Sequence, residues 1–548
     1  MTLISQSGAG MSGIVDVDER MNFNLAVSAG QELAVSVEDY MDWSLEQPET
    51  RVIGLFLETS RHPSKLIAAL KKACSRRIPV VALKVGRTAM SAELAVSHCG
   101  ALAGDDAAYD AVFDAYGVQR VDDMDEFATA LIMFAQPHPV APGGLVSIHD
   151  SGGERQLLID LAESRRVPLA RLASASIRKL EELLDPGLPA VNPLDAWSAG
   201  GAGYHRTMEA CFAALMCDGD AAFGAVIHDR SVAGTIHPTY AGYLRAGHAA
   251  SGKPAFLVSN RQGTGADPLV CELTRAGFPV LDGLASFLAG ARCLLGHRDF
   301  LNRPEASPPV ADRSVVERWR RRLEHGAVGE VDAMALLADG GIPAVTAIAI
   351  GSVKELRSRA AELEFPVVLK TANPSVPHKS DAGGVILGIR TPAELLKHYA
   401  ELSSRLGPMV TVAPMVAGHG IEMILGMIRD AQFGPVVLMG FGGVHAELFE
   451  DTVTALPPFD AATAERLIGG LRMRALLDGA RGRPMVDVEA FCRAAAAFSS
   501  IVPAVADLVR EIDINPVMVL ERGCMALDAL FVPAAPAADA DAKARRLA

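Results

Sequence analysis

A histidine in a loop of small residues is the first feature of the sequence that could do chemistry. The loop reads Ser97-His98-Cys99-Gly100-Ala101-Leu102-Ala103-Gly104. Gly100 and Gly104 add no side-chain bulk and tolerate positive φ, so other parts of the chain can approach the imidazole closely. A neutral imidazole is a nucleophile of moderate basicity near pH 7 and can carry a phosphoryl group. We therefore predict that His98 is phosphorylated; the alternative is an ordinary histidine in a turn.

Two turns rich in glycine and serine could hold that phosphate. The first is Ser5-Gln6-Ser7-Gly8, after a short strand, and the second is Ser151-Gly152-Gly153, before a helix expected over 154–164. A helix start presents free N–H groups and the positive end of the helix dipole to an anion. The contacts expected from these turns are Ser7, Gly8, Ser151, Gly152 and Gly153. The alternative is that both turns only reverse the chain.

Alternating strands and amphipathic helices must position these residues. Apolar strands are expected over 51–57 and 78–84, and the same alternation restarts over 143–281. This pattern predicts parallel, helix-covered sheets, in which ligands gather at the carboxyl ends of the strands. Glu58 directly follows the first of these strands and is a candidate partner for His98. The alternative is a solvated carboxylate at a strand end.

The carboxyl-terminal half holds residues suited to a nucleotide and a metal ion. Lys370 ends a strand and can reach nucleotide phosphates, and the flexible pair Gly383-Gly384 can close over them. Further on, Glu511, Asp513 and Asn515 alternate to one face of a strand, where three oxygen donors could hold Mg²⁺. The alternative is a polar strand face, which the strongly apolar neighbours disfavour.

Composition and charge exclude several classes of protein. The 548 residues, 50% hydrophobic and 21% charged, suffice for about three or four domains. The formal net charge of −14 excludes a general nucleic-acid or anionic-membrane surface. The eight cysteines include no Cys-x-x-Cys pair, so neither a zinc site nor a disulfide framework is indicated. No apolar run has the length of a membrane span, and we expect a cytoplasmic protein with no nucleic-acid or membrane partner.

Six segments in the expected order resemble the ADP-forming (NDP-forming) acyl-CoA synthetase family, which is related to succinyl-CoA synthetase. They are Ser5-Gln6-Ser7-Gly8, Ser97 to Gly104 with Tyr109-Asp110-Ala111-Val112-Phe113 after it, Asn192-Pro193-Leu194-Asp195, His378-Lys379-Ser380-Asp381-Ala382-Gly383-Gly384-Val385, Gln432-Phe433-Gly434-Pro435-Val436 and Asp513-Ile514-Asn515-Pro516. The resemblance covers nearly the whole chain. It implies an α/β fold with two flavodoxin-like, succinyl-CoA synthetase-like parallel-sheet domains followed by an ATP-grasp domain.

The resemblance also implies domain boundaries and residue roles. The boundaries are 1–138 for the domain with the phosphohistidine loop, 139–300 for the second flavodoxin-type domain, 301–330 for a linker and helix, 331–532 for the ATP-grasp domain and 533–548 for a disordered tail. His98 is then the phosphohistidine, Glu58 the carboxylate that hydrogen-bonds its ring, and His378 a second histidine that relays phosphate from the nucleotide. Expected nucleotide contacts are Lys370, Gly383, Gly384 and Glu422, and expected Mg²⁺ ligands are Asn515 and Asp528. The two glycine-rich turns begin helices that face each other across the phosphate.

The activity implied is that of an acid–thiol ligase. It forms acyl-CoA from a carboxylic acid, CoA and ATP, giving ADP and phosphate reversibly, through an acyl phosphate and phosphohistidine. An ATP-dependent lyase or another ligase with the same activation step is an alternative, as is a non-catalytic or regulatory subunit. The implied cofactors are ATP or ADP, Mg²⁺ and CoA as a substrate. The expected partners are a small carboxylic acid or acyl-CoA, a separate CoA-binding subunit and further copies in an oligomer.

The sequence departs from the family pattern in two regions. Most members begin with a Rossmann-like CoA-binding domain, which this sequence lacks, so a separate subunit, an upstream start or an acceptor other than CoA must account for it. In the ATP-grasp region, Ala413-Pro414 replaces the usual Gln-Glu, Ala455 the usual Arg and Glu450 a common Lys. The first change affects adenine or ribose contacts, and the other two remove positive charge that stabilises phosphates. Cys99 replaces a common threonine as a small-residue exchange.

Overall fold

The computed structural model describes residues 1–88, 90–91, 106–197, 203–231, 235–261, 267–373, 375–376, 379, 381–443 and 451–534. His98, Cys99, His378 and Glu450 lie outside the described residues, as do residues 535–548 of the predicted tail. The chain divides into two compact units. Unit 1 comprises Met1–Ala103 and Phe113–Arg303, and unit 2 comprises Gly104–Val112 and Pro304–Ala548.

The first half of unit 1 is built on a parallel sheet of five strands in the order β2-β1-β3-β4-β5. The strands are β1 (Thr2–Ser5), β2 (Leu25–Ser28), β3 (Ile53–Leu57), β4 (Val80–Lys84) and β5 (Gln119–Val121), and the helices are α1 (Gly8–Val15), α2 (Val37–Ser44), α3 (Pro63–Ser75), α5 (Asp106–Tyr116) and α6 (Met124–Ala135). Nearly every residue of β1, β3 and β4 is buried. Continuous burial is typical of parallel strands that helices cover on both faces.

The second half of unit 1 repeats this plan with the strand order β10-β9-β8-β6-β7, again entirely parallel. The strands are β6 (Gly144–His149), β7 (Leu194–Asp195), β8 (Ala221–Ile227), β9 (Ala255–Ser259) and β10 (Val280–Asp282), and the helices are α7 (Gly152–Ser164), α8 (Ser174–Leu183), α9 (Tyr204–Met216), α10 (Thr239–Ser251), α11 (Pro268–Arg275) and α12 (Leu284–Leu301). In both halves the first strand lies between the second and the third. This is the flavodoxin-like order, and it confirms the two predicted parallel-sheet domains.

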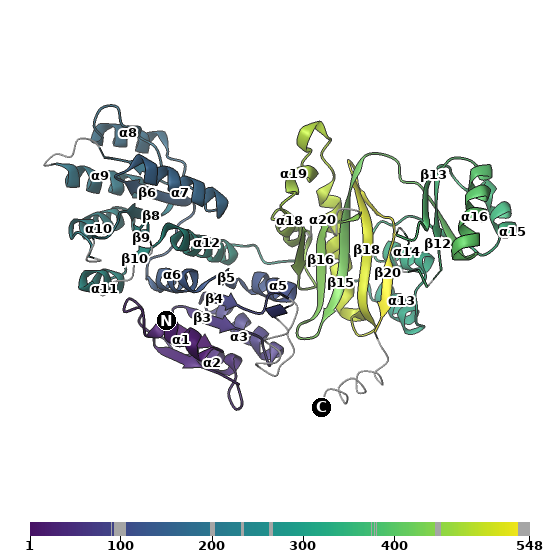
Figure 1. Ribbon diagram of the computed structural model, residues 1–548, viewed down its shortest axis with the longest axis horizontal. Coiled ribbons are helices and arrows are strands. Elements are labelled where there is room, and N and C mark those ends of the chain that lie inside the picture. The colour runs from purple at the N-terminus through teal and green to yellow at the C-terminus, as the bar shows by residue number, and fades with distance from the viewer. Residues whose placement is uncertain are drawn as a thin grey trace. The chain divides into compact units, whose positions relative to one another are not determined.

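A shared apolar core joins the two halves of unit 1. Helices α6 and α12 lie side by side between the two sheets (Figure 1), with Phe127 and Phe287 in one buried cluster. A Cβ added at Gly290 of α12 would lie 2.4 Å from the Met133 sulfur of α6. The glycine therefore permits the close approach of these helices, and the two sheets are held on one scaffold.

Unit 2 contains two mixed layers of sheet and helix, drawn in green and yellow in Figure 1. The smaller sheet has the order β11-β14-β12-β13, from β11 (Ile348–Ile350), β12 (Val367–Thr371), β13 (Val385–Ile389) and β14 (Val410–Pro414), with α15 (Val353–Arg359) and α16 (Pro392–Leu406). The larger sheet has the order β17-β16-β15-β18-β19, from β15 (Gly420–Asp430), β16 (Gly434–Phe441), β17 (Thr452–Ala455), β18 (Val509–Leu520) and β19 (Cys524–Ala526), with β20 (Leu530–Pro533) paired to β18. The remaining helices are α13 (Arg313–Glu324), α14 (Glu330–Asp339), α18 (Ala461–Ile468), α19 (Arg474–Leu477) and α20 (Val488–Val505).

Two helices of unit 2 contribute large side chains to its apolar core. The charged helix α13 buries Trp319 in the core of unit 2, and the Trp319 indole donates a hydrogen bond to the carbonyl of Leu336 at 2.9 Å. Helix α20 is long and apolar enough, by length and composition, to cross a membrane, and 56% of it is buried inside the protein. The expectation that no segment reaches this length was therefore wrong. Its Phe491 and Phe498 side chains pack in the apolar core, as in the core helix of a globular unit.

Candidate functional site

The carboxyl edge of the first sheet is organised by Gln6, the residue after β1. Its Oε1 accepts hydrogen bonds from the backbone N–H groups of Glu58 at 2.6 Å and Thr59 at 3.1 Å. Its Nε2 donates to the Thr59 carbonyl at 2.8 Å and to the Glu32 carboxylate at 2.9 Å. Gln6 is buried, so these bonds are protected from water. The end of β1 is thereby tied to the end of β3, which positions Glu58.

Helix α1 begins directly beside this network. Ser7 is its N-cap residue, and the Ser7 hydroxyl accepts a hydrogen bond from the N–H of Gly10 at 3.1 Å. Ser5 holds the turn, because its hydroxyl donates to the Ser7 carbonyl at 2.7 Å. The hydroxyl of Ser7 thus serves the helix, and the N–H groups of the first turn, beginning at Gly8, remain to face an anion.

Glu32, which sequence analysis did not identify, lies in the same network. Its carboxylate accepts from the N–H of Val37 at 2.7 Å, and the Arg61 guanidinium lies 3.3 Å away. Burial raises the pKa of the Glu32 carboxyl, although the hydrogen bonds from Val37 and Gln6 oppose that shift. Glu32 was missed because its partners come from other elements and no short motif contains it.

The carboxyl edge of the second sheet has a corresponding helix start. Ser151 is the N-cap residue of α7, and its side chain makes no capping hydrogen bond. A Cβ added at Gly152 would lie 3.1 Å from Oδ2 of Asp195, which ends β7. Gly152 and Gly153 are the first residues of α7 rather than turn residues before it. The predicted phosphate contacts Ser151, Gly152 and Gly153 therefore form one compact helix start beside Asp195.

Asp150 precedes that helix start and reaches across to the neighbouring strand. Its Oδ2 lies 2.9 Å from Nδ1 of His228, the residue after β8. The hydrogen bond from His228 lowers the pKa of Asp150, and burial opposes the shift. In strand order and position, Asp150 and His228 correspond to Gln6 and Glu58 of the first half. The sequence did not identify this pair, because the two residues are joined only through the sheet.

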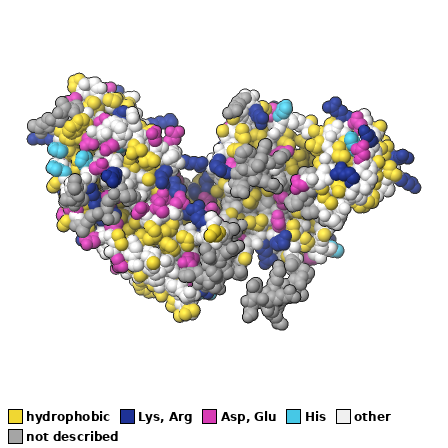
Figure 2. Space-filling model, viewed as in Figure 1, with side chains coloured by type: hydrophobic (Ala, Val, Ile, Leu, Met, Phe, Trp, Pro, Cys, Tyr) yellow, Lys and Arg dark blue, Asp and Glu magenta, His cyan; other side chains and the backbone are white. Residues whose placement is uncertain are grey.

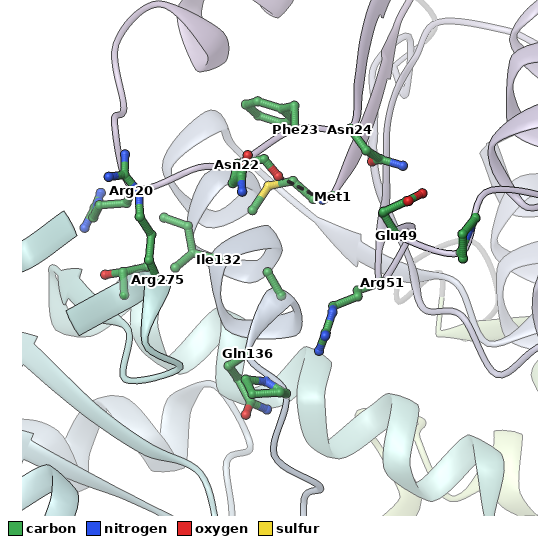
Figure 3. A pocket seen from close by; sticks show the side chains of 14 residues that line it. Met1, Arg20, Asn22, Phe23, Asn24, Glu49, Arg51, Ile132, Gln136 and Arg275 are labelled. Atoms are coloured by element: carbon green, nitrogen blue, oxygen red, sulfur yellow. Dashed lines mark hydrogen bonds between the residues drawn. The ribbon is translucent and has the colours of Figure 1, made fainter. Parts of the chain in front are cut away.

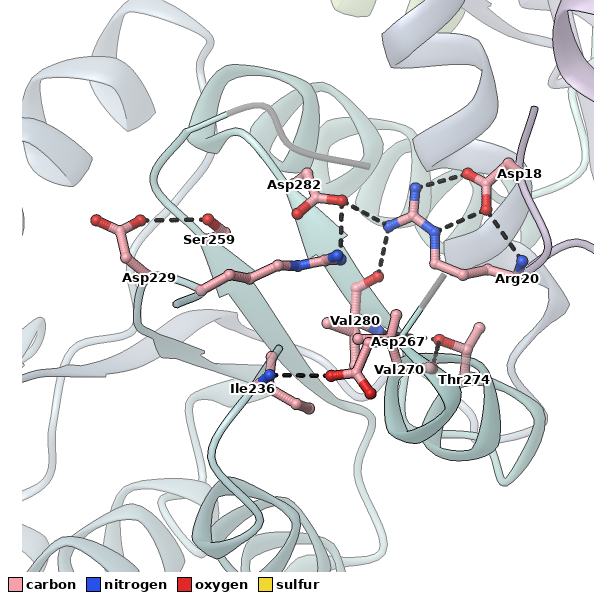
Figure 4. Close-up of polar contacts among 11 residues, drawn as sticks. Asp18, Arg20, Asp229, Ile236, Ser259, Asp267, Val270, Thr274, Val280 and Asp282 are labelled. Atoms are coloured by element: carbon pink, nitrogen blue, oxygen red, sulfur yellow. Dashed lines mark hydrogen bonds and ion pairs between the residues drawn. The ribbon is translucent and has the colours of Figure 1, made fainter. Parts of the chain in front are cut away.

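A buried ion cluster links the two halves beside the second edge. Arg20, in the loop after α1, lies 2.6 Å from Asp18 and 3.0 Å from Asp282, the last residue of β10 (Figure 4). Arg230 lies 2.9 Å from the same Asp282 oxygen. Burial raises the pKa of Asp282, and the two arginines oppose the shift. The cluster fixes the loop after α1 against the carboxyl end of β10.

In unit 2 the predicted nucleotide residue Lys370 and the predicted metal ligand Asp528 are ion-paired at 3.1 Å. Lys370 also lies 2.9 Å from Glu330, and Lys379 lies 2.6 Å from Glu330 and 3.0 Å from Asp528. Burial lowers the pKa of Lys379, but Asp528 and Glu330 outweigh it, so the net shift is upward. Two lysines and two carboxylates thus share one partly buried network. Sequence analysis did not identify Glu330, and it included Lys379 only as part of the motif that begins at His378.

The glycine pair after β12 shapes this network. The N–H of Gly384 donates to the Lys379 carbonyl at 2.7 Å, and the Gly384 carbonyl accepts from the N–H of Thr371 at 2.8 Å. A Cβ added at Gly384 would lie 2.7 Å from the Thr371 methyl and 2.9 Å from the Lys379 carbonyl oxygen, and Gly383 has φ +59°. Both positions therefore require glycine, and the tight turn they form sets Lys379 beside Lys370.

The predicted residues Glu422 and Asn515 surround a second tight turn. Asn515 Oδ1 accepts from the N–H of Gly443 at 2.9 Å, and the Glu422 carbonyl accepts from the N–H of Gly442 at 2.9 Å. A Cβ at Gly443, which has φ +61°, would collide with the Glu422 carboxylate at 1.5 Å. Asn515 and Asp528 therefore contact different partners, although both were predicted to bind Mg²⁺.

The donors of unit 2 suit a hard cation. Along β18, Ile512 and Ile514 are buried. Glu511, Asp513 and Asn515 alternate with them and are less buried, as predicted for one polar face of the strand. Within the described ranges, no group of three or more His, Cys, Asp and Glu residues is placed to hold a metal ion. Mg²⁺ bound with a nucleotide needs only one or two protein carboxylates or amides besides the phosphates. Asp528 and Asn515 fit that requirement.

The atypical alanines of unit 2 are core residues. Ala413 of β14 and Ala455 of β17 both belong to the buried apolar cluster of the unit, and Pro414 is exposed at the end of β14. Their small side chains fill the core, so they supply no charged contact at the nucleotide end.

Two of the sequence motifs meet in unit 2. Tyr109 of α5 is fully buried, and its hydroxyl donates to Gln432 Oε1 at 2.9 Å. The Tyr109 ring meets Phe433 edge-on, with 4.9 Å between ring centroids. The Thr454 hydroxyl donates to the Ala107 carbonyl at 2.7 Å. The first half of α5 is therefore anchored to the β15–β16 turn of unit 2, although α5 ends in unit 1.

A cavity of about 660 Å³ lies away from the predicted site residues and is lined in part by Arg20 of the ion cluster. It opens at the amino ends of β1 and β3, where Figure 3 draws Met1, Arg20, Arg51 and Arg275 around it. None of the predicted site residues lines this cavity. Because the predicted residues of unit 1 occupy the carboxyl ends of the strands, the cavity is on the other edge of the sheet.

Comparison with known proteins agrees with this architecture. A succinyl-CoA ligase like flavodoxin domain model matches residues 1–134, and an ATP-grasp domain model matches residues 321–532. A trans-feruloyl-CoA synthase from an unknown prokaryotic organism is 30% identical, over 92% of this chain and 72% of the relative. An ADP-forming acetate–CoA ligase I of Archaeoglobus fulgidus is 29% identical, over 96% of this chain and 77% of the relative.

A third relative is divided into two chains. The alpha subunit of the ADP-forming acetate–CoA ligase II of Pyrococcus furiosus is 32% identical over 45% of this chain and 52% of the subunit. The beta subunit is 31% identical over 36% of this chain and 86% of the subunit. The predicted fold, with two flavodoxin-like domains and an ATP-grasp domain, is confirmed. The chain belongs to the family of ADP-forming acyl-CoA synthetases, ATP-dependent ligases that form acyl-CoA thioesters.

Proposed function

We propose that this chain activates a carboxylic acid with ATP, using His98 as the phosphoryl carrier, and that the acyl group passes to CoA. The observation that carries the proposal is the route of the chain around His98. The segment leaves the first sheet after Lys84 of β4 and returns in α5, whose first half is anchored to the ATP-grasp unit through Tyr109. His98 thus stands in the sequence between the first sheet and a helix whose first half packs in the ATP-grasp unit, which supports a role as a carrier.

Three bond exchanges make up the reaction. First, a ring nitrogen of His98 attacks the γ-phosphorus of ATP, so the N–P bond forms and the P–O bond to ADP breaks. Second, a carboxylate oxygen of the acid attacks the same phosphorus, so the N–P bond breaks and an acyl phosphate forms. Third, the sulfur of CoA attacks the acyl carbon, so the C–S bond forms, the C–O bond breaks and phosphate leaves with the thiol proton.

The first half of unit 1 supplies the partner of the carrier. The backbone of Glu58 is fixed by Gln6 at 2.6 Å, so the Glu58 side chain is held at the carboxyl edge beside α1. We assign Glu58 to the ring of His98, where a carboxylate selects the tautomer that attacks phosphorus. The starts of α1, at Ser7 and Gly8, and of α7, from Ser151 to Gly153, hold the phosphate through N–H groups. Such binding needs little positive charge, consistent with the net charge of −14.

Unit 2 supplies the nucleotide end. Lys370 and Lys379 bind phosphate oxygens, Gly383 and Gly384 shape the turn over them, and Glu422 contributes to the nucleotide contacts. Asp528 and Asn515 would hold Mg²⁺, which neutralises phosphate charge. When a nucleotide binds, its phosphates replace Asp528 as the partner of Lys370 and Lys379. The Asp528 carboxylate is then released to bind the metal. His378 is proposed as the relay between this end and His98.

The remaining assignments concern organisation and partners. We propose that a separate CoA-binding subunit completes the enzyme, that the assembly is an oligomer in the cytoplasm, and that the domain boundaries are 1–138, 139–300 and 331–532. The division of one Pyrococcus furiosus relative into alpha and beta subunits supports a multi-chain enzyme.

Phosphoryl labelling tests the proposal. The full chain is incubated with γ-labelled ATP and Mg²⁺, and the label is expected to be acid-labile and base-stable, as a phosphohistidine is. It is expected to vanish in His98→Ala and to persist in His398→Ala, a control on the exposed face of α16. Label that survives in His98→Ala would overturn the carrier assignment. Acyl-CoA formation with ADP and phosphate, measured with a supplied CoA-binding partner, then separates the ligase from a lyase or a regulatory subunit.

A further inference from the structure

A single carboxylate joins the two lysines at the nucleotide end, and the proposed phosphate contacts do not account for it. Glu330 is the first residue of α14, and its side chain is almost fully buried. One of its oxygens lies 2.9 Å from the Lys370 ammonium, and the other lies 2.6 Å from that of Lys379. Figure 2 shows lysine and arginine side chains on the surface over α15 and α16, whereas these two lysines are largely buried. Because burying charges costs about as much as pairing them returns, such a bridge adds little stability and needs another explanation.

Glu330 is held in place independently of the lysines. The hydroxyl of Thr411, a buried residue of β14, donates to Glu330 Oε2 at 3.2 Å. The carboxylate also stands at the amino-terminal end of α14, where the helix dipole favours a negative charge. Helix α14 is itself anchored, because Leu337 lies in the apolar core and the Leu336 carbonyl accepts from the Trp319 indole. Glu330 is therefore a fixed point to which both lysine side chains are bound.

Asp528, the second carboxylate, is the more exchangeable partner of the lysines. Its side chain lies between β19 and β20 and is 21% exposed, against 5% for Glu330. It lies 3.1 Å from Lys370 and 3.0 Å from Lys379. Lys370 has two further acceptors, Glu330 and the Leu527 carbonyl, the latter at 2.6 Å. An ammonium group has three N–H donors, so a phosphate oxygen can take the place of Asp528 while the other two bonds of Lys370 remain.

We propose that Glu330 is a positioning residue for the nucleotide phosphates, which holds the ammonium groups of Lys370 and Lys379 side by side while Asp528 leaves to bind the metal. Without a fixed carboxylate between them, two ammonium groups in a largely buried site repel each other and turn away. Glu330 acts through the lysines and does not touch the nucleotide, whose phosphates its negative charge would repel. The inference rests on the proposed function, in which both lysines bind phosphate oxygens.

Nucleotides that differ in their number of phosphates test this role. Calorimetry on the full chain with Mg²⁺ measures the binding of AMP, ADP and a methylene-bridged ATP analogue that cannot transfer its terminal phosphate. In Glu330→Gln the loss of affinity is expected to grow with the number of phosphates. It should be small for AMP and about ten- to hundredfold for the analogue, the effect of misaligned hydrogen bonds between charged groups. A purely structural residue would weaken all three nucleotides by the same factor.

Glu489→Gln is the matched control. Glu489 also stands in the first turn of a helix of unit 2, α20, and its exposed carboxylate pairs with Arg493 of the same helix. The substitution removes a negative charge of the same kind without affecting the lysines. All three nucleotides are expected to bind this variant as they bind the native chain.

Thr411→Val provides a second variant, which leaves every charge in place and decides the matter if Glu330→Gln does not fold. It removes the hydrogen bond to Glu330 and is expected to weaken the analogue by about fivefold, with little effect on AMP. Equal losses for the three nucleotides, or undiminished affinity for the analogue in both variants, would refute the positioning role. If ATP labels His98 in the native chain, that result refutes the role of Glu330 alone. If the native chain binds none of the nucleotides and His98 is not labelled, the proposed function fails as well.

Discussion

The two halves of unit 1 have the same topology and different chemistry at the same place. In both, the residue after the first strand reaches across the switch point, where the strand order reverses, to the residue after the third strand. In the first half a neutral amide, Gln6, holds the backbone of Glu58 and makes no bond to its carboxylate. In the second half a carboxylate, Asp150, holds the side chain of His228 instead. The fold supplies a helix start and a switch point twice, and the side chains decide what each can bind.

The surroundings extend this contrast. Glu32 and Arg61 make the first edge ionic, with a buried carboxylate that Gln6 and Val37 stabilise. Rings of Trp197 and Tyr240 make the second edge aromatic. An ionic edge suits the orientation of an imidazole that carries phosphate, and we assign that task to the first half alone. The predictions below test whether the two halves divide the work in this way.

The largest effect is expected from Glu58→Gln. The amide keeps the size of the side chain and the backbone bonds from Gln6, but it removes the charge that orients His98. By analogy with carboxylates that orient a catalytic histidine, labelling from γ-labelled ATP should slow by about a thousandfold. Rapid-quench labelling measures the rate. The matched change in the second half, Asp150→Asn, should leave the labelling rate within about twofold, since its carboxylate faces His228. Equal losses in both variants would contradict the division.

A smaller loss is expected from Gln6→Ala. The change removes the acceptor of the N–H groups of Glu58 and Thr59 and leaves Glu32 with fewer partners. Glu58 then moves relative to His98, and a displacement of about one ångström costs about a hundredfold in rate. The measurement is again labelling from ATP, with the matched change Asp150→Ala in the second half as the control. That variant should be labelled at nearly the native rate; an equal loss would show that the first edge has no special part in positioning the carrier.

Local sequence patterns predicted much of this site, but they could not predict contacts between residues that are distant in the sequence. The strand, turn and helix around Ser7 and around Ser151 are encoded within about ten residues, so glycine and apolar periodicity were sufficient to predict them. Gln6 is part of the motif Ser5-Gln6-Ser7-Gly8, but its bond to Glu58 depends on how β1 and β3 align in the sheet. Register of that kind is set by tertiary packing and has no local signal.

The nucleotide end illustrates the same limit. Lys370 and Asp528 were each predicted to face the nucleotide, and their ion pair was not, because the two residues lie in separate elements of unit 2. The motifs with Tyr109 and Gln432 were both noticed, yet only the structure brings them into contact. Composition alone did not characterise helix α20, because a buried core helix and a membrane span have similar composition.

A moderate effect is expected from Tyr109→Phe, which loosens the first half of α5 from the β15–β16 turn within unit 2. The ring contact with Phe433 is kept and the 2.9 Å hydrogen bond to Gln432 is lost. One hydrogen bond contributes about 1 kcal/mol, so labelling of His98 from ATP should slow by about fivefold. Labelling from an acyl phosphate, which needs only unit 1, should not change. If both labelling rates fell alike, Tyr109 would support the fold of α5 and would not position the carrier.

The smallest effect is the pH dependence that His149 contributes to the second half. His149, the last residue of β6, is fully buried, and burial lowers its pKa to about 4. Its unfolded pKa is near 6.5, so between these values the unfolded chain binds the proton more strongly and stability falls as the pH falls. From pH 7 to pH 5 this amounts to about 2 kcal/mol. Urea unfolding should show that loss in the native chain and a smaller one in His149→Gln, whereas the exposed control His237→Gln should behave as the native chain does.

The first half has Ser5 at the corresponding strand end, which does not titrate. Acidification should therefore reduce the hydrogen-exchange protection of the β6 N–H groups more in the native chain than in His149→Gln.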